Sequence, residues 1–199
     1  MDNNEVYVIG RDGAPQYLRL EAGEARTLTL VIPPGASGRH VLEVDLVGPG
    51  ASLDLAGLYL CPGDERLDLR LLVRHTAGGC TSRQLFKGLV GGTARASFDG
   101  LVYVAQDAQK TQAYQENHTI LLSDTARVES RPQLEIYADD VQCSHGATTG
   151  YLNPDELFYL RSRGIPEAEA RRLQMVAFLA PVLRRLPEPL TEEIYACLS

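Results

Sequence analysis

The feature that most constrains this chain is a step of nearly constant length between short segments that resemble one another. The similar pentads begin at Ala51, Glu65, Cys80, Ala94, Gln109, Ala126 and Val141. Successive steps are therefore 14, 15, 14, 15, 17 and 15 residues. A solenoid produces such a step because each coil stacks on the one below, so that the corners must line up. We predict an all-β, parallel β-helix with two steps per coil.

Alternating apolar and polar residues support strands over much of the same region. Every second side chain of such a stretch lies on one face, as a strand requires. The stretches are 41–46, 52–60, 66–73, 96–104, 118–122 and 132–137. The alternative is an ordinary β-sandwich whose strands are evenly spaced by coincidence. A sandwich would give more hairpin turn signals, of which only Gly-Gly at 78–79 and 91–92 come close.

Composition changes near residue 150, and the remainder of the chain has helical patterns. We place a β-helix core at 1–150 and a C-terminal helical region at 151–199. The helices are expected to cap the open end of the β-helix, whose last coil would otherwise expose unpaired strand edges.

Three helices are predicted in this region. Asn153 before Pro154 is typical of a helix start, and this first helix should end at Gly164. A second should begin at Pro166, with a kink at Pro181. A third should follow the Pro187-Glu188-Pro189 break, over 191–198.

Bulk composition excludes several functions. A net charge of −7 and an isoelectric point near 5.1 argue against nucleic acid, which needs clustered Lys and Arg. There is no apolar run of 18 residues and no signal peptide at the N-terminus, so we expect a cytoplasmic protein with no membrane partner. The four cysteines form no CxxC pair and are expected to be free thiols: Cys61, Cys80, Cys143 and Cys197.

Familiar catalytic motifs are missing, which predicts a protein that is not an enzyme. The chain has no phosphate-binding GK[ST] loop, no HExxH and no GxSxG. A polysaccharide hydrolase would need paired carboxylates in a groove. Its only candidates are Glu129 and Glu135, six residues apart and interrupted by Pro132.

One segment, 137–150, combines residues that could bind a metal. Cys143 and His145 are two apart and would share one face of a strand, while Ser144 points to the other. Thiolate and imidazole suit iron, zinc or copper(I), but two ligands are half of a usual shell. The alternative is a small core cysteine beside a hydrogen-bonded corner histidine. The adjacent Asp139 and Asp140 are expected to form a solvated corner.

The other histidines are weaker candidates. His75 opens a strand corner and is expected to be structural, and His118 follows residues 115–117, which we interpret as a polar corner.

The stretch LLSDTARVESRPQLEIYADDVQCSHGATTGYLNPDELFYLRSRGI, residues 121–165, closely resembles the C-terminal signature of SufD-type members of the SufB/SufD family. Similarity continues through 75–88, 98–123 and the helical segment EAEARRLQMVAFLAPVL. The resemblance implies a right-handed parallel β-helix with flanking helices. It also implies a role as a scaffold for iron–sulfur cluster assembly. Expected partners are a SufB-like protein, or a second copy, paired through the β-helix, and a SufC-like ABC ATPase contacting the helices.

The resemblance also assigns the site. The family's functional histidine falls on His145, with Cys143 two residues before it, as ligands of iron or of a transient iron–sulfur cluster at a dimer interface. The scaffold cysteine of SufB-type members aligns with Ala126, and the acidic residues beside their histidine align with Ser144 and Gly146. The chain is therefore SufD-like. It is also shorter than typical members, and we expect a short form without the N-terminal helical domain. The alternative is a homodimeric β-helix binding module that has left cluster assembly.

Overall fold

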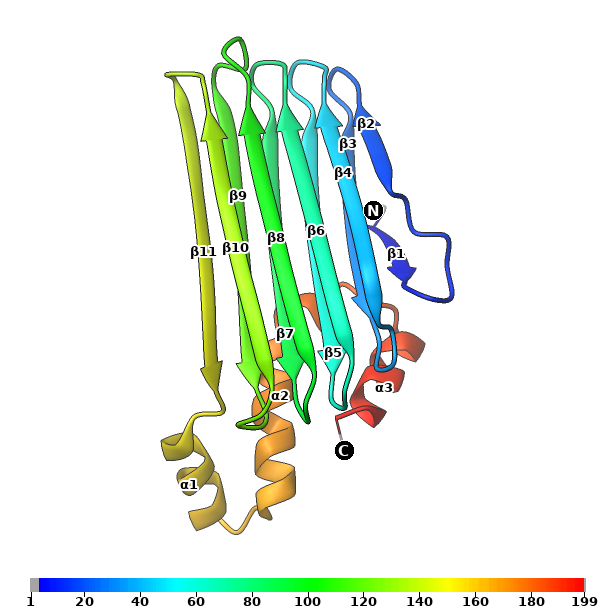
Figure 1. Cartoon of the computed structure of the whole chain (residues 1–199), viewed down its shortest axis with the longest axis vertical. Coiled ribbons are helices and arrows are strands. Elements are labelled where there is room, and N and C mark those ends of the chain that lie inside the picture. Colours follow the sequence, from blue (N-terminus) through cyan, green and yellow to red (C-terminus); the bar gives the residue numbers. More distant parts are fainter. Residues whose placement is uncertain (1–3, 199) are drawn as a thin grey trace.

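The computed structural model describes residues 4–198 as a two-sheet parallel β-solenoid followed by three helices (Figure 1). The odd-numbered sheet has the order β1 (Asn4–Val8), β3 (Ala25–Ile32), β5 (Ser52–Cys61), β7 (Thr81–Val90), β9 (Thr111–Leu121) and β11 (Val141–Tyr151). The even-numbered sheet has the order β2 (Tyr17–Leu20), β4 (Gly38–Leu46), β6 (Arg66–His75), β8 (Arg95–Val104) and β10 (Arg127–Ile136). The chain alternates between the sheets, so that two strands make one coil. This confirms the predicted β-helix.

The repeat found in the sequence marks the strand starts. Each of the seven pentads begins at, or at most two residues before, one of the strands β5 to β11. Register partners on successive coils are separated by about two steps, for example Ser52 with Thr81 and Arg95 with Arg127. The constant step therefore reflects in-register stacking of parallel strands, as a solenoid requires.

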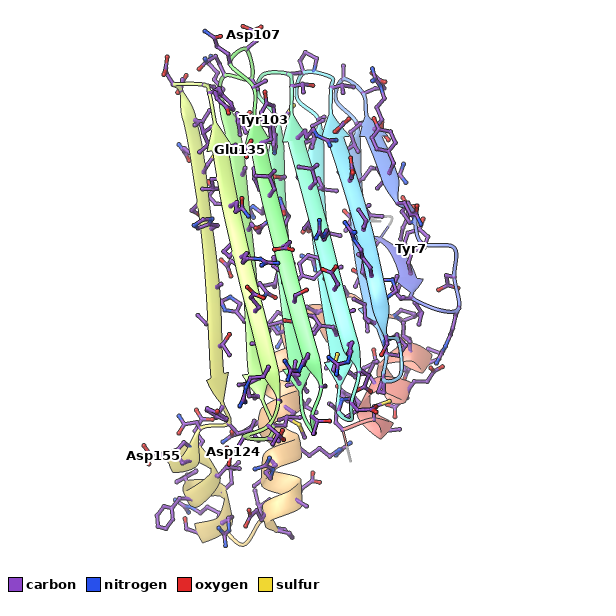
Figure 2. The ribbon with its side chains drawn as sticks, in the orientation of Figure 1. Tyr7, Tyr103, Asp107, Asp124, Glu135 and Asp155 are labelled. Carbon is purple, nitrogen blue, oxygen red and sulfur yellow. The ribbon has the colours of Figure 1, made fainter. Side chains whose placement is uncertain are left out.

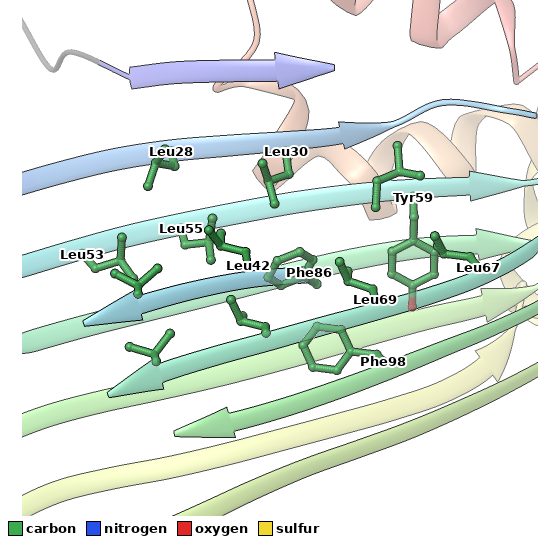
Figure 3. Close-up of a cluster of buried hydrophobic side chains, with 14 of the residues drawn as sticks. Leu28, Leu30, Leu42, Leu53, Leu55, Tyr59, Leu67, Leu69, Phe86 and Phe98 are labelled. Atoms are coloured by element: carbon green, nitrogen blue, oxygen red, sulfur yellow. The ribbon is translucent and has the colours of Figure 1, made fainter. Parts of the chain in front are cut away.

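The core lies between the two sheets and consists of the side chains that alternate inward from both. Leucines dominate its first coils, and aromatic rings fill its middle (Figure 3). The Phe86 and Phe98 rings, from opposite sheets, have their centroids 5.2 Å apart. Tyr59 is only 1% exposed and lies among the same side chains.

The helices are α1 (Pro154–Ser162), α2 (Glu167–Leu183) and α3 (Glu188–Ala196). The Asn153 side chain caps α1 by accepting from the backbone N–H groups of Asp155 and Glu156. The first two helices confirm the predicted starts. The third begins three residues earlier than predicted, because a proline in the first helical turn loses no intrahelical hydrogen bond, and Pro189 is therefore accommodated.

The helices do not lie where a cap of the last coil would lie. Leu179 and Val182 of α2 and Ile194 of α3 pack against Leu58 and Leu89 on the outer face of the odd-numbered sheet. Figure 1 shows the three helices gathered at one end of the strands. The expectation that they cover the open end is thus wrong, because the apolar stripe of α2 matches an apolar outer patch on β5 and β7. Within residues 4–198 no helix is long and apolar enough to cross a membrane.

Candidate functional site: the open end of the solenoid

The last coil, formed by β10 and β11, leaves its interior side chains uncovered. On the preceding coil, Val102 and Val104 are fully buried. Their register partners on β10 are Leu134 and Ile136, and Ile136 is 39% exposed. Tyr151 at the end of β11 is 61% exposed. The described chain therefore ends its solenoid on an open cross-section with two free strand edges.

Cys143 and His145 lie on this open cross-section. Cys143 pairs in register with Ala113 and His145 with Gln115, and both partners are completely buried inside the solenoid. Both candidate side chains consequently face the interior side, and Ser144 faces outward, as strand alternation predicted. Cys143 is partly buried, whereas His145 is exposed because no further coil covers it.

The two side chains differ in their chemistry. Burial raises the pKa of the Cys143 thiol, and the backbone N–H of Ala113 offsets this only in part. Cys143 packs at the edge of a small apolar cluster that includes Val102, Val104 and Ala113. At neutral pH it is thus a protonated thiol that becomes a ligand only when a metal displaces the proton. The imidazole of His145 is exposed, so that a metal or a partner can reach it from outside.

The ligand set offered by this end is incomplete. No cluster of three or more His, Cys, Asp or Glu side chains suited to a metal occurs among residues 4–198. Cys143 and His145 together would fill half of a tetrahedral shell. The remaining ligands would have to come from a partner or from the sulfides of a cluster.

A row of buried polar side chains leads to this end, and our sequence reasoning missed it. Gln84, Gln115 and His145 occupy the same register position on β7, β9 and β11. The Gln115 Nε2 donates to Gln84 Oε1 over 2.7 Å, while Gln115 Oε1 is buried without a partner. Ser82 continues the row to His75 with an oxygen–nitrogen distance of 2.9 Å. The sequence does contain a signal for this row: Gln115 and Gln84 precede His145 by about one coil and two coils.

The other candidate residues, the remaining histidines and the adjacent aspartates, lie apart from Cys143 and His145. Asp139 and Asp140 are exposed in the turn before β11, as expected. His75 is completely buried, which confirms a structural position. The polar corner expected around His118 is wrong: it lies in the middle of β9, where His118 faces outward and bonds Thr148 Oγ1 at 2.7 Å.

The hydrolase alternative is excluded by distance. Glu129 and Glu135 both face outward on β10, which continues through Pro132 as an edge strand. Six residues of strand separate their Cα atoms by about 20 Å, whereas a glycosidase pair needs about 5–9.5 Å. Glu129 is also paired with Arg131 at 3.0 Å.

The three cysteines outside the last coil differ in their exposure. All four are free. Cys61 and Cys80 are buried, and burial raises the pKa of Cys61 to about 12. Cys197 is exposed near the end of α3. The position aligned with the scaffold cysteine, Ala126, is completely buried at the start of β10.

A second exposed feature lies beside the open end, on α1. This helix has no buried residue. Phe158 is 74% exposed and Tyr159 57%. A groove of about 440 Å³ runs between α1 and α2, lined by apolar side chains such as Leu173 and Phe178 and by the polar Asn153, Glu156 and Gln174.

Comparison with known proteins shows which family the chain is similar to. The protein-family model described as "SUF system FeS cluster assembly, SufBD core domain" matches residues 20–178 of this chain. Iron-sulfur cluster assembly protein SufD of Escherichia coli (strain K12) is 42% identical over 163 residues, which cover 81% of this chain and 38% of that protein. Protein ABCI7, chloroplastic, of Arabidopsis thaliana is 38% identical over 174 residues, which cover 86% of this chain and 36% of that protein.

A third relative, the iron-sulfur cluster assembly protein SufD of Bacillus subtilis (strain 168), is 34% identical over 143 residues, covering 72% of this chain and 33% of that protein. The matches thus span only 33–38% of the length of these relatives. The match nevertheless includes most of the solenoid, the open end with Cys143 and His145, and the helices α1 and most of α2. With the parallel β-solenoid and these matches together, the chain belongs to the SufB/SufD family of iron–sulfur cluster assembly proteins.

Proposed function

We propose that this chain is a SufD-like scaffold or accessory component of the SUF iron–sulfur cluster assembly machinery, acting in the cytoplasm without catalytic activity of its own. The observation that carries this proposal is the uncovered last coil. There, two free strand edges and the interior-facing Cys143 and His145 are presented together at one end of the molecule.

The free edges give the end an affinity for another solenoid. An unpaired parallel edge presents a row of backbone N–H and C=O groups that readily pair with another strand. A solenoid docked against β10 and β11 would also cover Ile136 and Tyr151, whose apolar surface is now exposed. The proposed partner is a SufB-like protein, with a second copy of this chain as the alternative.

The ligand role follows from the same geometry. A partner docked on the open end would face Cys143 and His145 across the interface and could complete their coordination shell. Iron or a nascent cluster is then the cargo held transiently between the two proteins. The thiol and the imidazole are suitable donors for iron.

The exposed side of α1 is the proposed contact for an ABC-type ATPase of the SufC kind. Phe158 and Tyr159 are large side chains that are mostly exposed, with the Arg163 guanidinium over the Tyr159 ring. Exposed aromatic side chains beside a groove are typical of protein–protein interfaces.

The test is co-expression of the tagged chain with a SufB-like protein and the ATPase, followed by affinity purification and iron analysis. Unaltered chain should recover both partners. Ile136→Asp should abolish recovery of the SufB-like protein, because a carboxylate would be buried against the partner. The matched control is Glu135→Gln, which changes charge on the outward face of the same strand.

His145→Ala should leave the complex intact and lower its bound iron at least several-fold. His118→Ala, on the outer face of β9, is the control that should retain iron. Unchanged iron in the His145 variant would remove the ligand assignment. Recovery of a homodimer alone, with neither partner, would instead favour the binding module that has left cluster assembly.

A further inference from the structure

Three arginines stack in one register column on the outer face of the even-numbered sheet. Arg66, Arg95 and Arg127 are the first residues of β6, β8 and β10, and Arg95 pairs in register with both others. All three side chains are exposed. We call this set the arginine column. Since neighbouring strands are about 4.8 Å apart, the column spans about 10 Å.

The column is exceptional because its charges are unpaired. Like charges directly opposite each other on neighbouring strands are destabilising. Elsewhere on this sheet the outward arginines meet acids: Arg74 contacts Glu43 and Asp45 at 2.8 and 2.9 Å, and Arg131 contacts Asp99. Among residues 4–198 no ion pair involves any member of the arginine column.

The acids nearest to the column are engaged elsewhere. The next outward row contains Asp68, Ser97 and Glu129. Asp68 lies 3.8 Å from both Arg39 and Arg70, while Glu129 pairs with Arg131 on its other side. The three arginines therefore form no ion pair with this row, on a chain whose net charge is −7.

The column lines a hollow. A groove of about 300 Å³ runs across β6, β8 and β10, with the arginines along one side and the Asp68–Ser97–Glu129 row along the other. The Arg127 Nη1 is held in place by the backbone oxygens of Asp124 and Ala126, at 2.7 and 2.8 Å. Figure 2 shows Asp124 at the end of the strands nearest to the helices. Because the arginines and the row opposite them occupy outward-facing strand positions, the groove lies on the outside of the solenoid. It is separate from the interior-facing Cys143 and His145.

We propose that the arginine column binds a compact anion with two or more linked phosphoryl groups. The planar guanidinium binds phosphate oxygens through two parallel hydrogen bonds. A single phosphate can engage one or two of these arginines, whereas a chain of phosphoryl groups can reach along the column. The carboxylate and hydroxyl row opposite can accept hydrogen bonds from hydroxyl groups of the same ligand. Inorganic pyrophosphate and the phosphate chain of a nucleotide share this chemistry.

The test is titration calorimetry of the complete chain with sodium pyrophosphate, at constant ionic strength. We expect saturable binding of one pyrophosphate per chain. Arg95→Gln removes the middle of the column and should weaken binding at least tenfold. Arg74→Gln removes the same charge from the same face, at the far end of β6, and should change the affinity less than twofold. Thermal melting of each variant without ligand checks that it is folded.

A parallel titration with ADP separates the two sources of the ligand. Equal affinity for ADP and pyrophosphate means that the phosphate chain alone is recognised, and tighter binding of ADP means that the nucleoside also contacts the groove. Either result supports the site. Absence of saturable binding by both probes, or an equal loss of affinity in the Arg95→Gln and Arg74→Gln variants, would overturn it, because only a general effect of charge would then remain.

Discussion

At the scale of single residues, His75 links the interior polar row to the stability of the fold. It is the last residue of β6, is completely buried, and bonds Ser82 Oγ through its Nε2. Its Nδ1 is buried without a partner. Burial lowers the pKa of His75 to about 4, because the imidazolium form would lose its hydration. The folded protein therefore holds this side chain neutral.

This pKa shift predicts a dependence of stability on pH. Between about pH 4 and pH 6.5 the unfolded chain binds a proton at His75 that the folded chain does not, so stability falls as the pH decreases through this window. The loss attributable to His75 should reach about 3 kcal/mol at its lower end. Urea unfolding of the unaltered chain and of His75→Gln, at pH 7 and pH 4.5, measures it. Equal losses in the two proteins would show that His75 is not responsible.

Residue-level reasoning from the sequence found the face of Cys143 and His145 but not the row behind them. The first needs only the two-residue period of a strand. The second needs the register between coils, since Gln84 and Gln115 meet only when β7 and β9 stack. The repeat in the sequence gives that offset only approximately, because coil lengths vary with the turns.

At the scale of strands, β5 and β7 fit together through two reciprocal pairs of a glycine and an aromatic ring. Gly57 pairs in register with Phe86, and Tyr59 pairs with Gly88. A Cβ atom added to either glycine would overlap the ring beside it. The Tyr59 hydroxyl, which lies 2.6 Å from Thr119 Oγ1, is positioned by this arrangement. Each ring thus lies over the backbone of the neighbouring coil.

The strand pair predicts a sharp difference between two glycine substitutions. Gly88→Ala should cost about 1–3 kcal/mol, because the new methyl group displaces the buried Tyr59 ring from its place. Gly146→Ala on β11 is the control, since a Cβ atom there meets nothing within 4 Å. Its cost should stay below about 0.5 kcal/mol. Denaturant unfolding of both variants gives the comparison, and similar costs would contradict the reciprocal packing.

The predicted stretches match β5, β6 and β8 within two residues, whereas β9 and β10 begin seven and five residues before theirs. Strand β7 was not predicted from alternation, because part of it has polar side chains facing inward and apolar side chains facing outward. Ser82 and Gln84 point inward, while Leu85 and Leu89 point outward toward α2. A strand covered on both faces loses the alternation that identifies an exposed one. The helix patterns in the last 50 residues had no such competing influence, so their starts were easier to locate.

At the scale of the whole molecule, the helices and the solenoid share an apolar cluster and should unfold together. Leu179 of α2 is completely buried against the outer face of the odd-numbered sheet. Leu179→Ala should destabilise the protein by about 2–5 kcal/mol, since it removes buried methyl groups and leaves a cavity. Leu173→Ala, at a side chain that is 40% exposed, should cost less than about 1 kcal/mol.

Urea unfolding followed by circular dichroism and by tyrosine fluorescence should give coincident transitions for the unaltered chain and for both variants. A separate early transition of the helices would show that they form an independent unit. The coincident result would mean that the helices and the solenoid unfold as one cooperative unit.

The sequence by itself determined the parallel β-solenoid, the helical region after it and the shared face of Cys143 and His145. These features depend on periods of two residues, of one coil step and of one helical turn, all of which can be read along the chain. Only the tertiary structure decided which end of the solenoid stays open, which face the helices cover, and that Arg66, Arg95 and Arg127 stand in one column. Those features join residues that are distant in sequence, and the packing of whole sheets and helices brings them together.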